Sequence, residues 1–178
     1  MNGLLPEFPY HPDPVATGVI VPSGVACICC GQARGYIYTG PVYAVEDLDD
    51  QLCPWCIADG SAAERFKASF TGGTLADDVL PEVFSAVGTR TPGFTAWQEP
   101  HWLFHCGDGA AFIGLAGSGE LTAYPDALEM LRQEATSRGW PPEEVNQYLS
   151  SLDKDDQPTA YLFRCRVCEK YLAYSDFT

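Results

Sequence analysis

The chain is poor in basic residues: it has 10 Lys and Arg against 24 Asp and Glu, which gives a formal net charge of −14. Binding to nucleic acid regardless of its sequence depends on cationic side chains that neutralise phosphates, so this charge balance disfavours a nucleic-acid-binding role. A basic protein suits such a surface better, because opposite charges steer association. We therefore expect a protein partner and no nucleic acid.

Long apolar runs are also missing, and no stretch is long enough to span a bilayer. Residues 1–7 lack the basic segment and the following apolar run of a secretory signal. We therefore expect no membrane association and a cytoplasmic location. Thiols stay reduced there, and Cys-x-x-Cys pairs hold metal more often than they form structural disulfides.

Several catalytic signatures are absent as well. The glycine-rich segment 114–119 has neither the lysine of a P-loop nor the glycine order of a dinucleotide-binding turn, so we expect an ordinary loop. There is no Gly-x-Ser-x-Gly motif, and no His-x-Glu accompanies the Cys-Pro-Trp-Cys segment as a zinc deaminase requires. These absences favour a protein that is not an enzyme.

Cysteine, in contrast, is plentiful, with eight residues in a chain that can bury a core without covalent staples. Cys27 and Cys30 form one Cys-x-x-Cys pair, and Cys53 and Cys56 form another after 22 intervening residues. This spacing is typical of a four-thiolate zinc site, because each tight turn places two sulfurs on one side of a tetrahedron. Cys29 is then the spare thiol, and its role stays open.

A third pair, Cys165 and Cys168, needs two further ligands if it also holds zinc. His105 and Cys106 are the nearest candidates by type, which would give a site of three thiolates and one imidazole. Adjacent residues on a regular strand point to opposite faces, so both can bind only if the backbone bends, and Gly107 permits a bend. The sequence thus predicts one zinc ion and leaves room for a second.

Two other arrangements of the ligands remain open. His101 is a reserve ligand for the second site, and an interleaved pairing would join Cys27 and Cys30 to Cys165 and Cys168. The sequence alone does not choose between these pairings.

The pair Cys53 and Cys56 could instead form a redox dithiol, because a Cys-x-x-Cys at a helix start has a lowered thiol pKa. The helix signal begins only near Ser61, with a capping-box pattern, so neither sulfur need face a helix N-terminus. The second pair at zinc spacing also favours metal.

We expect an α+β fold, with short antiparallel strands that carry zinc-ribbon-like cysteine knuckles and a few peripheral helices on one side. One domain should cover residues 1–178, with a Pro-rich arm at 1–24 running extended over the surface and a ribbon-like subregion at 25–60. In that subregion, strands 35–39 and 42–45 should form a hairpin around Gly40 and Pro41. Further strands are expected at 101–107 paired with 111–115, and on both sides of 165–168; helices are expected after residue 61 and at 80–87, 125–138 and 142–152.

Four segments together resemble the bacterial CbrC family: LPEFPYHPDPVATG at 5–18, GYIYTGP at 35–41, LCPWCIADGSA at 52–62 and YLAYSD at 171–176. The likeness covers the whole chain. The resemblance implies a cytoplasmic protein named for tolerance to a DNase-type colicin, with no enzymatic activity firmly attached to the family. No catalytic residue carries over, but the cysteine motifs carry over as metal ligands.

The working hypothesis is therefore a non-enzymatic, cytoplasmic zinc protein that binds another protein, a basic toxin in a tolerance or immunity role. The alternative is a metal-dependent enzyme of unknown reaction whose pocket involves His11, His101 and Asp13. A metal site with an open position for water, beside a cleft lined by those residues, would favour the alternative.

Overall fold

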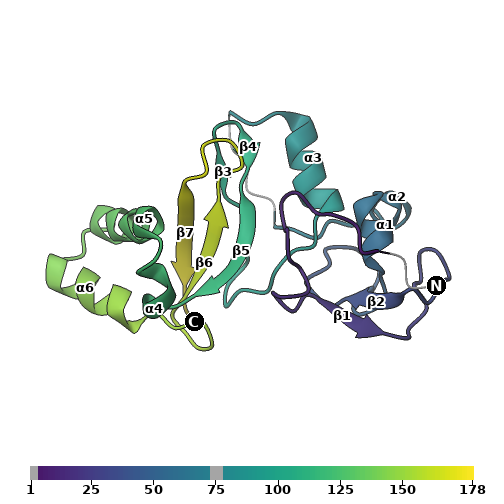
Figure 1. The fold of residues 1–178 in the computed structure, drawn as a ribbon, viewed down its shortest axis with the longest axis horizontal. Helices are drawn as coiled ribbons and strands as arrows, with labels where there is room; N and C mark the ends of the chain where they lie inside the picture. The colour runs from purple at the N-terminus through teal and green to yellow at the C-terminus, as the bar shows by residue number, and fades with distance from the viewer. Residues whose placement is uncertain (1–3, 73–77) are drawn as a thin grey trace. The chain divides into compact units, whose positions relative to one another are not determined.

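A computed structural model describes residues 4–72 and 78–178 of the chain. The fold is α+β with short antiparallel strands, as predicted. Where the sequence suggested one domain over residues 1–178, the chain divides into two compact units: residues 1–95 with 100–102, and residues 96–99 with 103–178 (Figure 1). Each unit has its own hydrophobic cluster, so each is described by itself.

In the first unit, β1 (Ile20–Ser23) pairs antiparallel with β2 (Gly35–Tyr38). The strand at 35–38 was expected, but its pairing with 42–45 was not found. Tyr43 instead forms an isolated bridge with Ser69. Proline has no N–H to donate and holds the preceding residue extended, so the Gly40-Pro41 step carries the chain away from β2 instead of closing a hairpin.

The Pro-rich arm does not keep the extended course that the sequence suggested; its residues 1–3 lie outside the described range. Turns occupy much of residues 9–18, and the N–H of His11 donates to the carbonyl of Phe8 at 3.1 Å. Phe8 and His11 are 3% and 0% exposed. The arm is therefore part of the core of the first unit.

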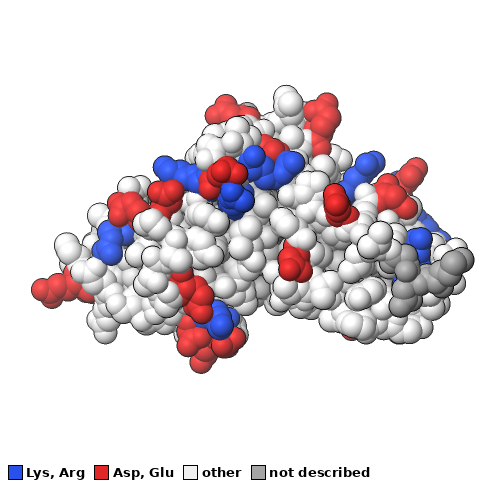
Figure 2. Space-filling view, viewed as in Figure 1, with Lys and Arg blue, Asp and Glu red and all other residues white. Residues whose placement is uncertain are grey.

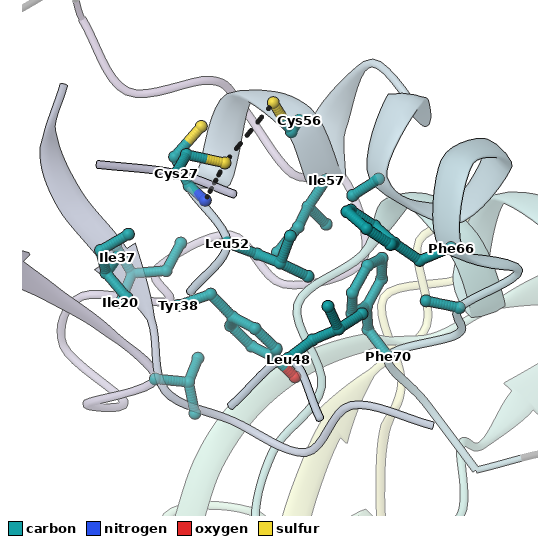
Figure 3. Packing of buried hydrophobic residues seen from close by; sticks show 14 of the residues in the cluster. Ile20, Cys27, Ile37, Tyr38, Leu48, Leu52, Cys56, Ile57, Phe66 and Phe70 are labelled. Atoms are coloured by element: carbon teal, nitrogen blue, oxygen red, sulfur yellow. Dashed lines mark hydrogen bonds between the residues drawn. The ribbon is translucent and has the colours of Figure 1, made fainter. Parts of the chain in front are cut away.

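Among its described residues, the first unit continues with the helices α1 (Pro54–Ala58), α2 (Ser61–Phe66) and α3 (Pro81–Arg90). The helices at 61 and near 80 were predicted, whereas α1 was missed because five residues give no readable period. Its signal is Pro54 at the first helical position, where the missing N–H costs nothing. Figure 3 shows the apolar cluster that these elements enclose, with Leu52, Ile57 and Phe70 at its centre.

The second unit contains a sheet of three antiparallel strands in the order β5 (Ala111–Ala116), β6 (Thr159–Arg164), β7 (Tyr171–Asp176). The strands on both sides of 165–168 were predicted. The expected pairing of 101–107 with 111–115 is wrong, because β5 pairs with β6 and the earlier segment closes on itself. There, β3 (Phe104–His105) and β4 (Asp108–Gly109) form a hairpin of two residues each.

Three helices belong to this unit: α4 (Ser118–Leu121), α5 (Pro125–Ser137) and α6 (Pro142–Ser151). The last two were predicted, and α5 packs on β7. The prediction of a loop at 114–119 is wrong, because its first residues end β5 and Ser118 begins α4. The side chain of Glu120 caps this helix by accepting the N–H of Gly117 at 3.0 Å. The described helices include none that is both long and apolar enough to cross a bilayer.

Candidate metal centres

The first cluster brings together the sulfurs of Cys27, Cys30, Cys53 and Cys56, which all lie within 4.8 Å of one another. The Sγ atoms of Cys27 and Cys56 are 3.9 Å apart, and so are those of Cys30 and Cys53. A regular tetrahedron with metal–sulfur bonds of about 2.3 Å has edges of about 3.8 Å. Four thiolates at these separations therefore fit one tetrahedral, thiophilic metal ion.

The first pair lies on a tight backbone turn. The N–H of Gly31 donates to the carbonyl of Cys27 at 2.7 Å, and the N–H of Cys27 donates to the carbonyl of Gln32 at 3.0 Å. Gly31 has a φ of 71°, a left-handed conformation that glycine adopts without a steric penalty. This turn places Cys27 and Cys30 on the same side of the backbone.

The last pair repeats the same turn between β6 and β7. The N–H of Glu169 donates to the carbonyl of Cys165 at 3.1 Å, and the N–H of Cys165 donates to the carbonyl of Lys170 at 2.8 Å. Glu169 has a φ of 63°, so it takes the left-handed place that Gly31 holds in the first turn. Two segments 138 positions apart thus form the same Cys-x-x-Cys knuckle.

The other half of the first cluster lies at the start of α1. Cys53 is the N-cap residue, and its backbone N–H donates to the sulfur of Cys27 at 3.2 Å. The helix thus begins directly after Cys53, so the expectation that no helix starts beside this pair was wrong. What favours metal over a redox dithiol is the placement of Cys27 and Cys30, whose sulfurs complete a tetrahedron that a two-cysteine redox site does not have.

The other half of the second cluster is the turn of the β3–β4 hairpin. Cys106 and Gly107 have φ values of 54° and 74°, and positive φ at both central residues is the mark of a type I′ turn. This is the bend that was needed for both neighbours to bind. His105 Nδ1 lies 3.2 Å from the sulfur of Cys106 and 3.5 Å from that of Cys168, and Cys165 completes the group.

Without a cation, the sulfurs of the first cluster share protons. Hydrogen bonding to Cys53 lowers the pKa of the Cys27 thiol to about 4, although burial opposes this. The same hydrogen bond, followed by burial, raises the pKa of Cys53, and burial raises the pKa of Cys56 to about 12. One thiolate is therefore stabilised by hydrogen bonds from neighbouring protonated thiols. A divalent cation would replace the thiol protons and offset the negative charge of the sulfurs that it binds.

In the second cluster, burial raises the pKa of the Cys165 thiol. The backbone N–H groups of Cys168 and Val167, both 3.4 Å from its sulfur, outweigh this effect and bring the pKa down to about 6. Hydrogen bonding to Cys168 raises the pKa of Cys106 to about 11. Such N–H groups, pointed at a sulfur, support a bound thiolate.

The remaining sequence candidates lie outside both clusters. All eight cysteines are free thiols, and the structure groups each pair as described, so the interleaved arrangement is not the one it shows. The sulfur of Cys29 lies 3.7 Å from the hydroxyl oxygen of Ser61. Among residues 4–72 and 78–178, neither metal-ligand cluster includes Cys29, His11, Asp13 or His101.

His11 packs and hydrogen-bonds locally, which is the more common role of such a histidine in a Pro-rich segment. Its Nδ1 lies 2.8 Å from the carbonyl oxygen of Pro92, which can only accept, so Nδ1 carries the proton. Its Nε2 then accepts from the hydroxyl of Thr17 at 2.6 Å. Burial lowers the pKa of His11 to about 4. The hydrogen bond to the carbonyl of Pro92 and the charge of Asp13 both raise this pKa, but burial outweighs them. The imidazole is neutral and holds the arm in place.

Comparisons with known proteins agree on a family. Residues 5–177 match the model of the "Uncharacterised protein family (UPF0167)". A UPF0167 protein of Mycobacterium bovis is 53% identical over 175 residues, which cover 97% of this chain and 94% of the relative; a UPF0167 protein of Mycobacterium tuberculosis matches equally well. A UPF0167 protein of Pseudomonas aeruginosa is 41% identical over 181 residues and the full length of both chains.

No solved structure matches this chain significantly. The family match spans nearly the whole chain, and the relatives are matched along nearly their whole length. The chain therefore belongs to the UPF0167 family.

Proposed function

We propose that this UPF0167 protein is a non-enzymatic, cytoplasmic zinc-binding protein that acts by binding a basic protein partner. The observation that carries the zinc half of the proposal is the tetrahedral spacing of donors in two separate clusters. Zinc is the ion that four-thiolate and three-thiolate, one-imidazole sites hold most often, and in such sites it links distant segments of chain.

Each site would be closed. Four protein donors complete a tetrahedral shell, which leaves no position for the water that a catalytic zinc activates. In the first cluster, the ligands come from a knuckle at 27–30 and from the start of α1 at Cys53 and Cys56. The metal would therefore join two segments of one unit, which is a structural task and not a catalytic one.

The partner half of the proposal is supported by charge near the N-terminal arm. A cavity of about 560 Å³ lies beside the arm, lined mainly by prolines and apolar residues such as Phe8 and Ile20, and also by Glu7 and Asp13. No Lys or Arg precedes Arg34 in the sequence. An apolar wall with two carboxylates suits the long stem and cationic head of a Lys or Arg side chain.

The tolerance role rests on the resemblance to the CbrC family. DNase-type toxins need a basic surface to hold DNA, so an acidic protein can compete for that surface. Acidic residues are spread over the visible face of the molecule, while Lys and Arg are fewer (Figure 2).

The alternative, a metal-dependent enzyme with a pocket near His11 and His101, stays a prediction without a specific observation in its favour. The cavity beside the arm is lined by Asp13 but by neither histidine. Both ring nitrogens of His11 are engaged by Pro92 and Thr17, which leaves no lone pair for a metal.

The zinc half is tested by the intact mass of protein purified without added metal, under native and denaturing conditions. We expect two zinc ions per chain in the native mass and eight reduced thiols after acid denaturation. Elemental analysis identifies the metal. A metal-free chain whose mass is lower by pairs of hydrogens would overturn the proposal, because the cysteines would then form disulfides.

The partner half is tested with the nuclease domain of a DNase-type colicin as the probe. The double variant Glu7→Gln and Asp13→Asn removes both charges from the cavity, and Asn keeps the oxygen that accepts the N–H of Ala16. The matched control, Glu143→Gln and Glu144→Gln at the start of α6, removes the same charge elsewhere. Tight, salt-sensitive binding that only the first variant weakens supports the proposal, and absent or salt-independent binding overturns it.

A further inference from the structure

The two metal clusters differ in how they are embedded, and we propose from this difference that the second is an exchangeable metal site. In this proposal, the group of His105, Cys106, Cys165 and Cys168 takes up and releases a thiophilic divalent cation while the chain stays folded. The first cluster holds its ion for as long as its unit is folded. The inference rests on the proposed zinc sites and assigns them different roles.

Three of the four ligands of the first cluster are part of the hydrophobic core of its unit, whereas Cys30 is exposed. Cys27, Cys53 and Cys56 are 1%, 0% and 3% exposed and belong to the same buried cluster as Leu52 and Ile57. Figure 3 shows Cys27 and Cys56 directly beside those side chains. Removal of the metal requires protons to reach these buried sulfurs in its place, because several buried thiolates without a counterion are costly. Loss of this ion therefore requires the core to open.

Most of the second cluster lies at the surface of its own unit, and Cys165, which is 1% exposed, is its single buried ligand. The apolar cluster that the three-stranded sheet and the helices α4, α5 and α6 form contains no cysteine. Of the four ligands, Cys106 and Cys168 are exposed, His105 is half-buried and only Cys165 is buried. An incoming chelator or thiol can therefore reach the metal from solvent, one ligand at a time.

The elements that present the second group also keep it assembled without metal. Asp108 of the β3–β4 hairpin pairs with Arg166 of the last knuckle, with 2.6 Å between Nη1 and the carboxylate oxygen. The sulfur of Cys165 lies 3.8 Å from the carbonyl oxygen of His105. The ion pair joins the hairpin to the knuckle by atoms that do not bind metal, so the emptied site is ready to bind again.

The experiment is chelation of the wild-type protein. Native mass spectrometry follows metal stoichiometry during incubation with EDTA, and far-UV circular dichroism follows folding. We expect a species with one metal and unchanged secondary structure to accumulate, because the first ion leaves only through opening of its unit, at a rate at least about tenfold lower. Added Zn²⁺ should restore the two-metal species without a refolding step.

Two variants locate the lost ion. Cys168→Ser removes an exposed ligand of the second group, and we expect it to be folded, to hold one metal and to lose none to EDTA on the time scale of the first wild-type step. Cys56→Ser is the matched change in the first group, and we expect it to lower the melting temperature or prevent folding.

Three outcomes are distinguished. A one-metal intermediate that is folded, and that Cys168→Ser mimics, supports the proposal. Simultaneous loss of both ions, or loss of the first cluster's ion before the second's, overturns the exchange while leaving two zinc sites intact. A chain purified without any metal overturns the zinc function itself, and with it this inference.

Discussion

The buried histidine of the N-terminal arm makes the stability of the protein depend on pH. Burial lowers the pKa of His11 to about 4, whereas an unfolded histidine has a pKa of 6.5. Between pH 6.5 and pH 4, His11 is therefore protonated in the unfolded chain but not in the folded chain. The contribution of His11 to the free energy of unfolding is at its full value above pH 6.5 and decreases as the pH falls toward 4. A shift of this size corresponds to about 3 kcal/mol in full, of which about 2 kcal/mol is lost between pH 7.5 and pH 5.

The test compares the wild-type protein with His11→Gln, which offers an N–H donor and an oxygen acceptor but does not titrate. We expect the variant to be less stable at pH 7.5, because its amide does not reproduce both contacts with Pro92 and Thr17. Its free energy of unfolding should then fall less than that of the wild type between pH 7.5 and pH 5.

Urea titrations at several pH values measure both curves. Acid also protonates the metal ligands, but both chains carry the same ligands, so this effect cancels in the difference between them. Parallel curves for the two proteins would refute the reasoning, as would an NMR titration in which the ring of His11 protonates near pH 6.5.

Three other substitutions test single contacts by thermal or urea unfolding. Glu169→Gly removes an exposed ion pair with Arg164, which contributes little, but it should stabilise the protein slightly, by up to about 1 kcal/mol, because the φ of 63° suits glycine; a clear loss would contradict this. Gly93→Ala should destabilise by about 1–3 kcal/mol, since its Cβ would overlap the carbonyl oxygen of Phe70, whereas Gly24→Ala, with open space around it, should not. Tyr161→Phe should destabilise the protein by about 1–3 kcal/mol, because the buried carboxylate of Asp176 loses the hydroxyl that donates to it at 2.8 Å. An unchanged stability would refute this role of the hydroxyl.

Local chemistry was readable from the sequence. The Cys-x-x-Cys pairs predicted knuckles because two cysteines three positions apart can meet only across a tight turn, and the structure has such turns at 27–30 and 165–168. The helices at 125–138 and 142–152 were predicted because proline, early acidic residues and a 3.6-residue period agree there. These signals depend on neighbours in the chain.

Long-range pairing was not readable. The strand at 35–38 was predicted, but with the following segment, 42–45, as its partner. In the structure it pairs with β1, which precedes the first knuckle. The strand at 111–116 likewise pairs with β6, some fifty positions later. Nothing in a short apolar run says which other run it meets, since every such run has the same period of two.

The sequence by itself thus determined which residues can bind metal, that the chain is acidic and that strands and helices are mixed. The tertiary structure decided which knuckle joins which half-site and that His11 is a buried neutral anchor. It also decided that one cluster has three buried ligands and the other has one. The reason is physical: ligand chemistry and turn propensity are properties of a few adjacent residues, whereas burial and pairing depend on contacts between segments far apart in the chain.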